Sequence, residues 1–271
     1  QNIDASLEPG GNYLVDIALF AEKIKEERSI PPQDYIFLCF LLGNDFMPHF
    51  PSVNIRTGGH EKLMKAYALL ELGTTPERCL IQVEDYVETG PLRQHGEPEL
   101  VKSDGGGVIQ WRNMYALINY LSTQEERFLI QEHKQRDATS KRLNDRFHPA
   151  DVGRREITHT GSDREKFEQM RFEQSPQIER ADERRINPFR PHWDERYYQT
   201  LFPESRRFHI SRVREQICKD YLEGLAWTYD YYTRGCPDYR WKYPYSYPPL
   251  FRDILKYMDK VNCLVQFIPS P

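Results

Sequence analysis

The chain has 271 residues, of which 39% are hydrophobic and 29% charged, and it carries a formal net charge of −4. This length allows one or two domains with a packed core, and the charge balance excludes a uniformly basic nucleic-acid-binding surface while leaving room for local basic patches. The five cysteines show no C-x-x-C spacing and no apolar run is long enough to span a bilayer, so the sequence indicates neither a zinc site, a disulfide framework nor a membrane anchor; an intracellular location, cytoplasmic or nuclear, is expected.

The first part of the chain is expected to form three helices. Apolar residues at helical spacing predict an amphipathic helix over residues 13–27. After two prolines, Asp34 is expected to cap a buried helix that runs to Leu42, with Gly43 at its C-terminal end. A third amphipathic helix is predicted over residues 60–72.

The later elements are separated by turn-forming residues. Residues 85–107 lack a clear period and end in a glycine-rich turn, which is followed by a predicted short strand at 108–111. The helical period returns over residues 112–129 and again over 210–229. Pro249 is well placed as the first residue of a last helix.

Residues 134–190 have a different composition from the rest. Apolar side chains almost vanish there, and Arg, Lys, Asp and Glu alternate densely. Such a segment buries too little apolar surface to offset the entropy of ordering it. We therefore expect a long, charged, flexible insertion, either a solvated spacer or an arm that contacts nucleic acid.

The apolar run at residues 35–42 leads into a turn that carries one acidic residue, Asp45. Because Asp and Asn favour turns and helix caps, this residue can be a turn former and nothing more. Magnesium-dependent phosphodiester hydrolysis instead requires several carboxylates that converge on one small site. Asp34 lies about 16 Å away at the other end of the same predicted helix, so Asp45 alone would be an incomplete site.

Three sequence blocks, in the same order, resemble the XRN family of 5′→3′ exoribonucleases. They are "DYIFLCFLLGNDFMPHFPSVNIRTGGHEKLMKAY" (34–67), "SDGGGVIQWRNMYALINYLSTQEERF" (103–128) and "YLEGLAWTYDYYTRGCPDYRWKYPYSYPPL" (221–250). A charged, variable insertion between the second and third blocks is also usual in that family. Because three ordered matches are far more specific than one, the chain is identified as a member.

The resemblance implies an activity and a cofactor. Family members remove nucleotides one at a time from single-stranded RNA that bears a 5′ monophosphate, releasing nucleoside monophosphates. They use two Mg²⁺ ions held by a set of acidic residues, and the aspartate of "GNDF" is the last of that set. It corresponds to Asp45, which is therefore the expected catalytic and metal-binding residue. The other acids belong to the family's N-terminal nuclease region, which is the expected intramolecular partner of this chain.

The resemblance also implies a mainly α fold, with four segments. Residues 1–85 would be the end of an α/β PIN/flap-nuclease-like domain carrying the last metal-binding acid, and 86–133 a strand–helix extension. Residues 134–190 would be the insertion, and 191–271 a truncated helical second region with an aromatic RNA-contacting segment. Because the sequence starts at Gln1 rather than Met, we expect a fragment. It should be inactive in isolation, because one carboxylate cannot hold two divalent ions.

The third block is rich in aromatic residues. Tyr229 and Tyr232 follow the helical period and are expected in the core. Trp241 lies among prolines between two cations, where it can be a packing residue or a platform on which an RNA base stacks, and the resemblance favours stacking. The RNA-binding candidates of this segment are Trp241, Tyr245, Arg240 and Lys242.

Three residues that follow the acidic turn are further candidates. His49 is a poor magnesium ligand because hard cations prefer oxygen, so it is either a packing residue or a phosphate contact near the metal site. Arg56 and Lys62 are candidates for binding the RNA backbone, although solvated surface cations are their ordinary interpretation.

Two functions of different classes are compatible with these features. The first is a segment of the exoribonuclease. The alternative is a non-catalytic module that binds RNA or protein and derives from that family. A DNA-directed flap endonuclease would share Asp45 but would not account for the aromatic block.

Overall fold

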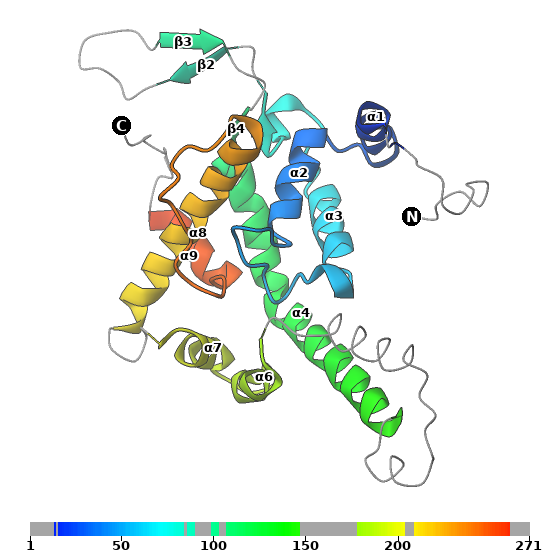
Figure 1. Ribbon diagram of the computed structural model, residues 1–271, viewed down its shortest axis with the longest axis vertical. Coiled ribbons are helices and arrows are strands. Elements are labelled where there is room, and N and C mark those ends of the chain that lie inside the picture. The colour runs from blue at the N-terminus through cyan, green and yellow to red at the C-terminus, as the bar shows by residue number, and fades with distance from the viewer. Residues whose placement is uncertain are drawn as a thin grey trace, which may run out of the picture.

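The computed structural model describes residues 14, 16–83, 86–89, 99–102, 107–146, 178–203 and 209–260. The described part is mainly helical, as expected (Figure 1). Its helices are α1 (Ile17–Arg28), α2 (Pro32–Phe40), α3 (Gly59–Leu69), α4 (Trp111–Arg146), α6 (Arg180–Ile186), α7 (Trp193–Leu201), α8 (Ile210–Thr233) and α9 (Phe251–Lys260). Within this part of the chain, no helix combines the length and apolar character needed to cross a bilayer.

The described strands form two small antiparallel pairs. Strand β1 (Ile81–Gln82) pairs with β4 (Val108–Ile109), with Ile81 opposite Ile109. Strand β2 (Tyr86–Thr89) pairs with β3 (Glu99–Lys102). Because the β1–β4 pair leads directly into α4, it fixes the start of that helix against the segment that follows α3.

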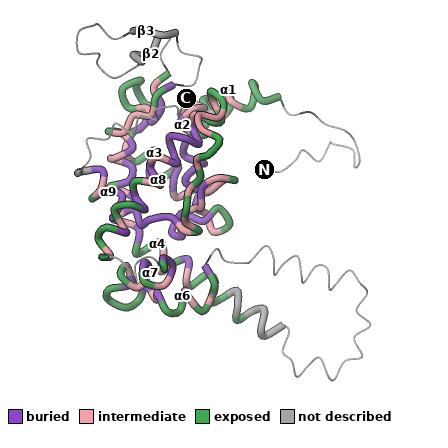
Figure 2. The backbone as a smooth tube through the Cα atoms, turned by 60° about the vertical axis from the view of Figure 1, so that its left-hand side comes forward, coloured by how far each residue is buried: buried purple, intermediate pink, exposed green. Residues whose placement is uncertain are grey.

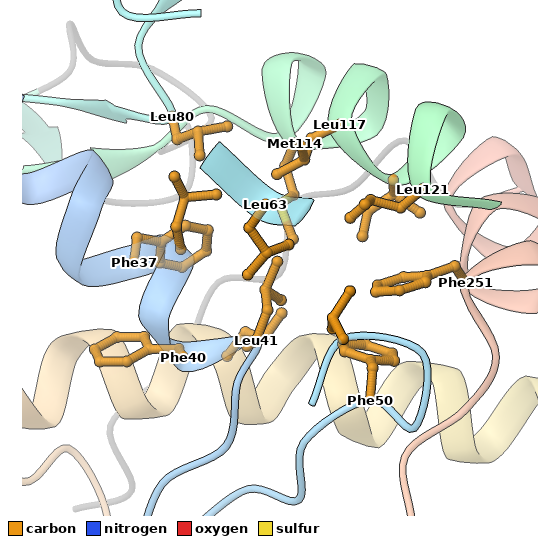
Figure 3. Packing of buried hydrophobic residues seen from close by; sticks show 14 of the residues in the cluster. Phe37, Phe40, Leu41, Phe50, Leu63, Leu80, Met114, Leu117, Leu121 and Phe251 are labelled. Atoms are coloured by element: carbon orange, nitrogen blue, oxygen red, sulfur yellow. The ribbon is translucent and has the colours of Figure 1, made fainter. Parts of the chain in front are cut away.

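The main hydrophobic core lies where α2, α3, α8 and α9 meet the first half of α4 (Figures 1 and 3). Phe37 and Leu41 from the α2 segment, Leu117 from α4 and Phe251 from α9 are all fully buried in it. The ring of Phe50, from the loop after α2, stacks on Phe251 at a centroid distance of 3.9 Å. The loop that carries Asp45 is therefore anchored in this core through Phe50, at the C-terminal end of the loop.

A second, smaller core lies where α6 and α7 meet the N-terminal half of α8 (Figure 1). Its buried members include Trp193, Tyr197 and Tyr198 of α7 and Ile217 of α8. The Tyr197 hydroxyl donates a hydrogen bond to the carbonyl of Pro248 at 2.8 Å, which ties α7 to the segment that leads into α9.

Asp34 does not cap α2, contrary to expectation. Pro31 occupies the cap position, and Asp34 lies inside the first turn with its side chain fully buried. Its carboxylate accepts hydrogen bonds from the backbone N–H groups of Leu80 and Ile81, both at 2.8 Å, and from the Tyr67 hydroxyl at 2.5 Å. The residue therefore joins α2 to α3 and β1.

The charged segment expected at 134–190 is ordered at both ends, so those boundaries were wrong. Helix α4 continues through Arg146, and α6 lies before residue 190 with Ile178 and Ile186 buried in the second core. Ion pairs between α4 and the α6 segment, such as Arg136–Glu183, stabilise these parts where apolar side chains are few. The middle of the predicted insertion lies outside the described residues.

Helix α1 is the most superficial of the described helices, and none of its residues is buried (Figure 2). The Asp16 side chain caps it by accepting a hydrogen bond from the Leu19 backbone N–H at 3.0 Å. The predicted helix is thus confirmed from Ile17, but only Ile24 of its large apolar side chains packs against the main core, and Ile17, Leu19 and Phe20 are exposed.

Candidate nucleic-acid interface

Asp45 lies in a tight turn immediately after the buried helix α2, and its side chain is exposed. Gly43 makes the turn possible, because its φ is +88° and a Cβ there would lie 3.0 Å from the backbone nitrogen of His49. The Asn44 side chain then accepts hydrogen bonds from the N–H groups of Phe46 at 2.9 Å and Met47 at 3.0 Å. The carboxylate is thus presented to solvent from a backbone that is fixed on both sides.

The aromatic end of α8 lies directly beside this turn. The ring of Phe46, next in sequence to Asp45, meets Trp227 edge to face at 5.0 Å and Tyr231 at 4.7 Å. Tyr232 stacks on Phe40, the last residue of α2, at 5.5 Å. The structure therefore brings the predicted acid and the predicted aromatic segment together, although they are about 190 residues apart in sequence.

Trp241 is more deeply packed than the sequence indicated. Its ring stacks on Trp227 at 4.9 Å with an interplanar angle of 22°. A Cβ added to Gly224 would lie 2.7 Å from its Cη2 atom, so glycine is needed there for the ring to fit. One face of Trp241 is thus used for packing, and a stacked base would have to use the other.

The other candidates of the aromatic segment are placed differently. Tyr245 is half-buried and meets Phe202 of the second core edge to face at 5.8 Å. Arg240 has a side chain that is 71% exposed, and its Nε atom lies 3.2 Å from Asp238 Oδ1. Lys242 is exposed on the other side of Trp241. The two cations therefore lie at the surface, where phosphate groups could reach them.

Two of the candidates that follow the acidic turn also differ. Arg56 is exposed, in a short 3₁₀ helix (Ile55–Thr57). His49 is half-buried, with its Nδ1 atom 3.0 Å from the carbonyl oxygen of Phe50. Burial lowers the pKa of His49 and thereby favours its neutral form, and this effect outweighs the hydrogen bond to the Phe50 carbonyl, which raises the pKa. This environment favours packing over contact with a phosphate as a cation.

The described residues do not make a divalent-metal site by themselves. None of the His, Cys, Asp and Glu side chains in this part of the chain form a group of three or more that could hold a metal. Asp45 is an exposed carboxylate in this part of the chain, and its role as a metal ligand stays a prediction.

Residues 23–267 match the family described as the Xrn1 helical domain. The chain belongs to this family. The expected membership of the XRN family is thereby confirmed.

Several curated relatives of this Xrn1 helical domain are named as exoribonucleases. The chain is 25% identical over 246 residues to the 5′-3′ exoribonuclease 2 homolog of Drosophila melanogaster, covering 84% of the chain and 25% of the relative. It is 24% identical over 311 residues to 5′-3′ exoribonuclease 2 of Debaryomyces hansenii, covering 87% and 30%. For 5′-3′ exoribonuclease 2 of Arabidopsis thaliana the identity is 23% over 294 residues, covering 92% and 29%. The chain thus spans at most about a third of these relatives' length.

Sequence reasoning missed a buried polar cluster that anchors the loop after Asp45 in this Xrn1 helical domain. Glu132 of α4 is almost fully buried and accepts hydrogen bonds from Lys62 Nζ at 2.8 Å and from the Thr57 hydroxyl. Lys62 also donates to the carbonyl of Ser52 at 3.1 Å, and its side chain is only 15% exposed, so this expected phosphate contact is instead engaged inside the protein. Because Glu132 and Lys62 are 70 residues apart and each lies in a charged stretch, no local signal identified them as partners.

Proposed function

We propose that this chain is part of a magnesium-dependent 5′→3′ exoribonuclease that degrades 5′-monophosphorylated single-stranded RNA processively to nucleoside monophosphates. One observation carries the proposal: within an Xrn1 helical domain, the exposed carboxylate of Asp45 lies beside the aromatic end of α8. An acid for metal binding and rings for base stacking are the two features that such a nuclease needs in close proximity.

Asp45 would contribute one ligand to a pair of magnesium ions, and the remaining acids would come from a nuclease region of the same polypeptide. When bound, magnesium would stabilise the negative charge that develops at the scissile phosphate. The contribution of this chain is the rigid backbone that holds Asp45, because the Asn44 side chain binds the N–H groups of Phe46 and Met47.

The RNA strand would run from Asp45 along the aromatic segment. The half-buried rings of Trp241 and Tyr245 would offer stacking surfaces, which contribute about 1–3 kcal/mol per base. Arg240 and Lys242, both exposed, would contact phosphates, as would Arg56 beyond the acidic turn. His49 is a weaker candidate for a phosphate contact, because its surroundings favour the neutral imidazole.

The test is Asp45→Asn in the full-length protein, which keeps the size of the side chain and removes its charge. We expect the variant to lose degradation of 5′-monophosphorylated RNA, by at least about a hundredfold in kcat, because a metal ligand acts on the reacting phosphate itself. RNA binding, measured by fluorescence anisotropy, should stay within about twofold, since the aromatic and basic contacts remain.

Glu26→Gln on α1 is the matched control, because it neutralises another exposed carboxylate away from the aromatic segment. It should degrade RNA at the wild-type rate. Normal turnover by the Asp45→Asn variant would contradict the metal assignment. A full-length protein that binds RNA but never cleaves it would instead support the non-catalytic binding module.

A further inference from the structure

Tyr232 is exposed, although the helical period predicted that it would be buried in the core. It lies in the last turn of α8 and is 51% exposed, whereas Tyr229, one turn earlier, is 2% exposed and in the core as expected. The prediction that Tyr232 is a core residue was therefore wrong. A half-exposed tyrosine beside a candidate acid is a candidate for contact with a ligand.

The ring of Tyr232 is held in place from several directions. It stacks on Phe40 at a centroid distance of 5.5 Å, and it meets Phe46 edge to face at 6.2 Å. The ring of Tyr231 is perpendicular to it at 5.5 Å. These contacts fix the direction of the hydroxyl, so a ligand would bind without first having to order this side chain.

The ring of Tyr232 lies beside the acidic turn, because it meets Phe46, the residue that follows Asp45, at a centroid distance of 6.2 Å. In this place burial raises the pKa of Tyr232, and the Asp45 carboxylate raises that pKa further, so the phenol stays neutral. A neutral phenol is a hydrogen-bond donor. Tyr232 thus offers a hydrogen-bond donor on the half-exposed aromatic surface beside the acidic turn, next to which the proposed function puts a phosphodiester.

We propose that Tyr232 is a substrate-contacting residue, whose hydroxyl donates a hydrogen bond to a non-bridging oxygen of the phosphate that is held at Asp45. This inference rests on the proposed function and adds a residue to it. Hydrogen bonds to charged oxygens are short and strong, so one such bond would position the strand relative to the acid. Tyr231 is less suited to the same task, because it is the less exposed of the two tyrosines, at 38% against 51% for Tyr232.

The first test is Tyr232→Phe in the full-length protein, which keeps the ring and its packing and removes only the hydroxyl. We expect kcat/KM for 5′-monophosphorylated RNA to fall by about tenfold or more, the effect of losing one hydrogen bond to a charged group. Tyr120→Phe removes the hydroxyl of another incompletely buried tyrosine, on α4, and should leave kcat/KM unchanged.

The second test replaces the scissile phosphate with a neutral methylphosphonate and compares RNA binding by the wild type and the variant. If the hydroxyl binds that phosphate, the replacement should cost the wild type about tenfold more affinity than it costs Tyr232→Phe. An equal cost for both proteins, or a normal kcat/KM for Tyr232→Phe, would overturn the inference. The Asp45→Asn result stays independent: loss of activity there with normal Tyr232→Phe turnover would overturn only the role of Tyr232.

Discussion

At the scale of single residues, Asp34 shows how one buried carboxylate joins three elements. Its two oxygens accept hydrogen bonds from Leu80, Ile81 and Tyr67, and all of these groups are removed from water. Asp34→Asn should destabilise the fold by about 1–3 kcal/mol, because an amide nitrogen would face a backbone N–H that then has no acceptor. Urea denaturation of the purified chain measures this difference.

Tyr67→Phe is the companion variant for this prediction. It removes one donor and leaves the two backbone hydrogen bonds to Asp34 intact, so it should destabilise by about 0.5–1.5 kcal/mol, less than Asp34→Asn. If Asp34→Asn unfolded at the wild-type urea concentration, the carboxylate would not be the link between α2 and β1.

Single-residue roles were predictable only where the local sequence decides them. Gly43 ends the α2 segment with a positive φ, as its place after an apolar run indicated. The roles of Asp34 and Glu132 depend on partners 46 and 70 residues away, and periodicity carries no information about such partners. Tyr232 follows the helical spacing of the buried residues of α8, but it lies in the last turn, beyond the end of the core. Its exposure therefore could not be predicted from spacing.

At the scale of elements, α9 begins against a buried acid of α4. Glu125 is 1% exposed, and its two carboxylate oxygens accept hydrogen bonds from the N–H groups of Phe251 at 2.8 Å and Arg252 at 3.3 Å. These are the first N–H groups of α9, which have no partner within that helix. The position of α9 on α4 is thus set by one side chain.

This arrangement makes stability depend on pH. Burial raises the pKa of Glu125 to about 8 in the folded chain, from an ordinary value near 4.5. Between these values the folded state binds more protons than the unfolded state, so this group lowers stability as the pH rises, by up to about 1.4 kcal/mol per pH unit. Glu125→Gln should flatten the dependence of the free energy of unfolding on pH between 5 and 8, as measured by urea denaturation.

Glu126→Gln is the matched control, because Glu126 is the exposed neighbour of Glu125 on the same helix. It should keep the wild-type pH dependence. An unchanged pH profile in Glu125→Gln would show that another group titrates in this range.

The sequence predicted the centres of the helices more accurately than their ends. The apolar periods placed α2, α3, α8 and α9 correctly, because each of these helices buries one face against the main core. The end of α4 at Arg146 was missed, since its second half is polar and is stabilised in part by pairs such as Arg136–Glu183. Likewise, the adjacent Glu125 and Glu126 look equivalent in sequence, although only the first is buried.

At the scale of the whole molecule, the mainly helical class followed from periodicity, whereas the arrangement of the helices did not. The main core combines residues from Ile30 to Met258, so it forms only when distant segments meet. That meeting is what places Asp45 beside the aromatic end of α8. The family resemblance pointed to Asp45 and to the aromatic segment as candidate site residues. Only the structure shows that the two are adjacent, through the contact between Phe46 and Tyr231.

The buried polar cluster around Glu132 joins α3, α4 and α6 to the loop that follows Asp45. Lys62 and Thr57 bind one carboxylate oxygen, and Arg136 lies 3.9 Å from the other while also pairing with Glu183 of α6. Glu132→Gln should destabilise the fold by about 3–5 kcal/mol in urea denaturation, because it leaves two largely buried cations short of a counter-charge.

A double-mutant cycle with Lys62→Met tests whether this effect comes from the buried pair. Each single variant leaves a partner charge uncompensated, whereas the double variant removes both charges of the 2.8 Å contact. The double variant should therefore be more stable than the sum of the two single changes predicts, by about 1–3 kcal/mol. Because the Thr57 contact ties the segment containing Arg56 to α4, Glu132→Gln should also speed tryptic cleavage after Arg56. Strict additivity with an unchanged cleavage rate would mean that Glu132 does not anchor this loop.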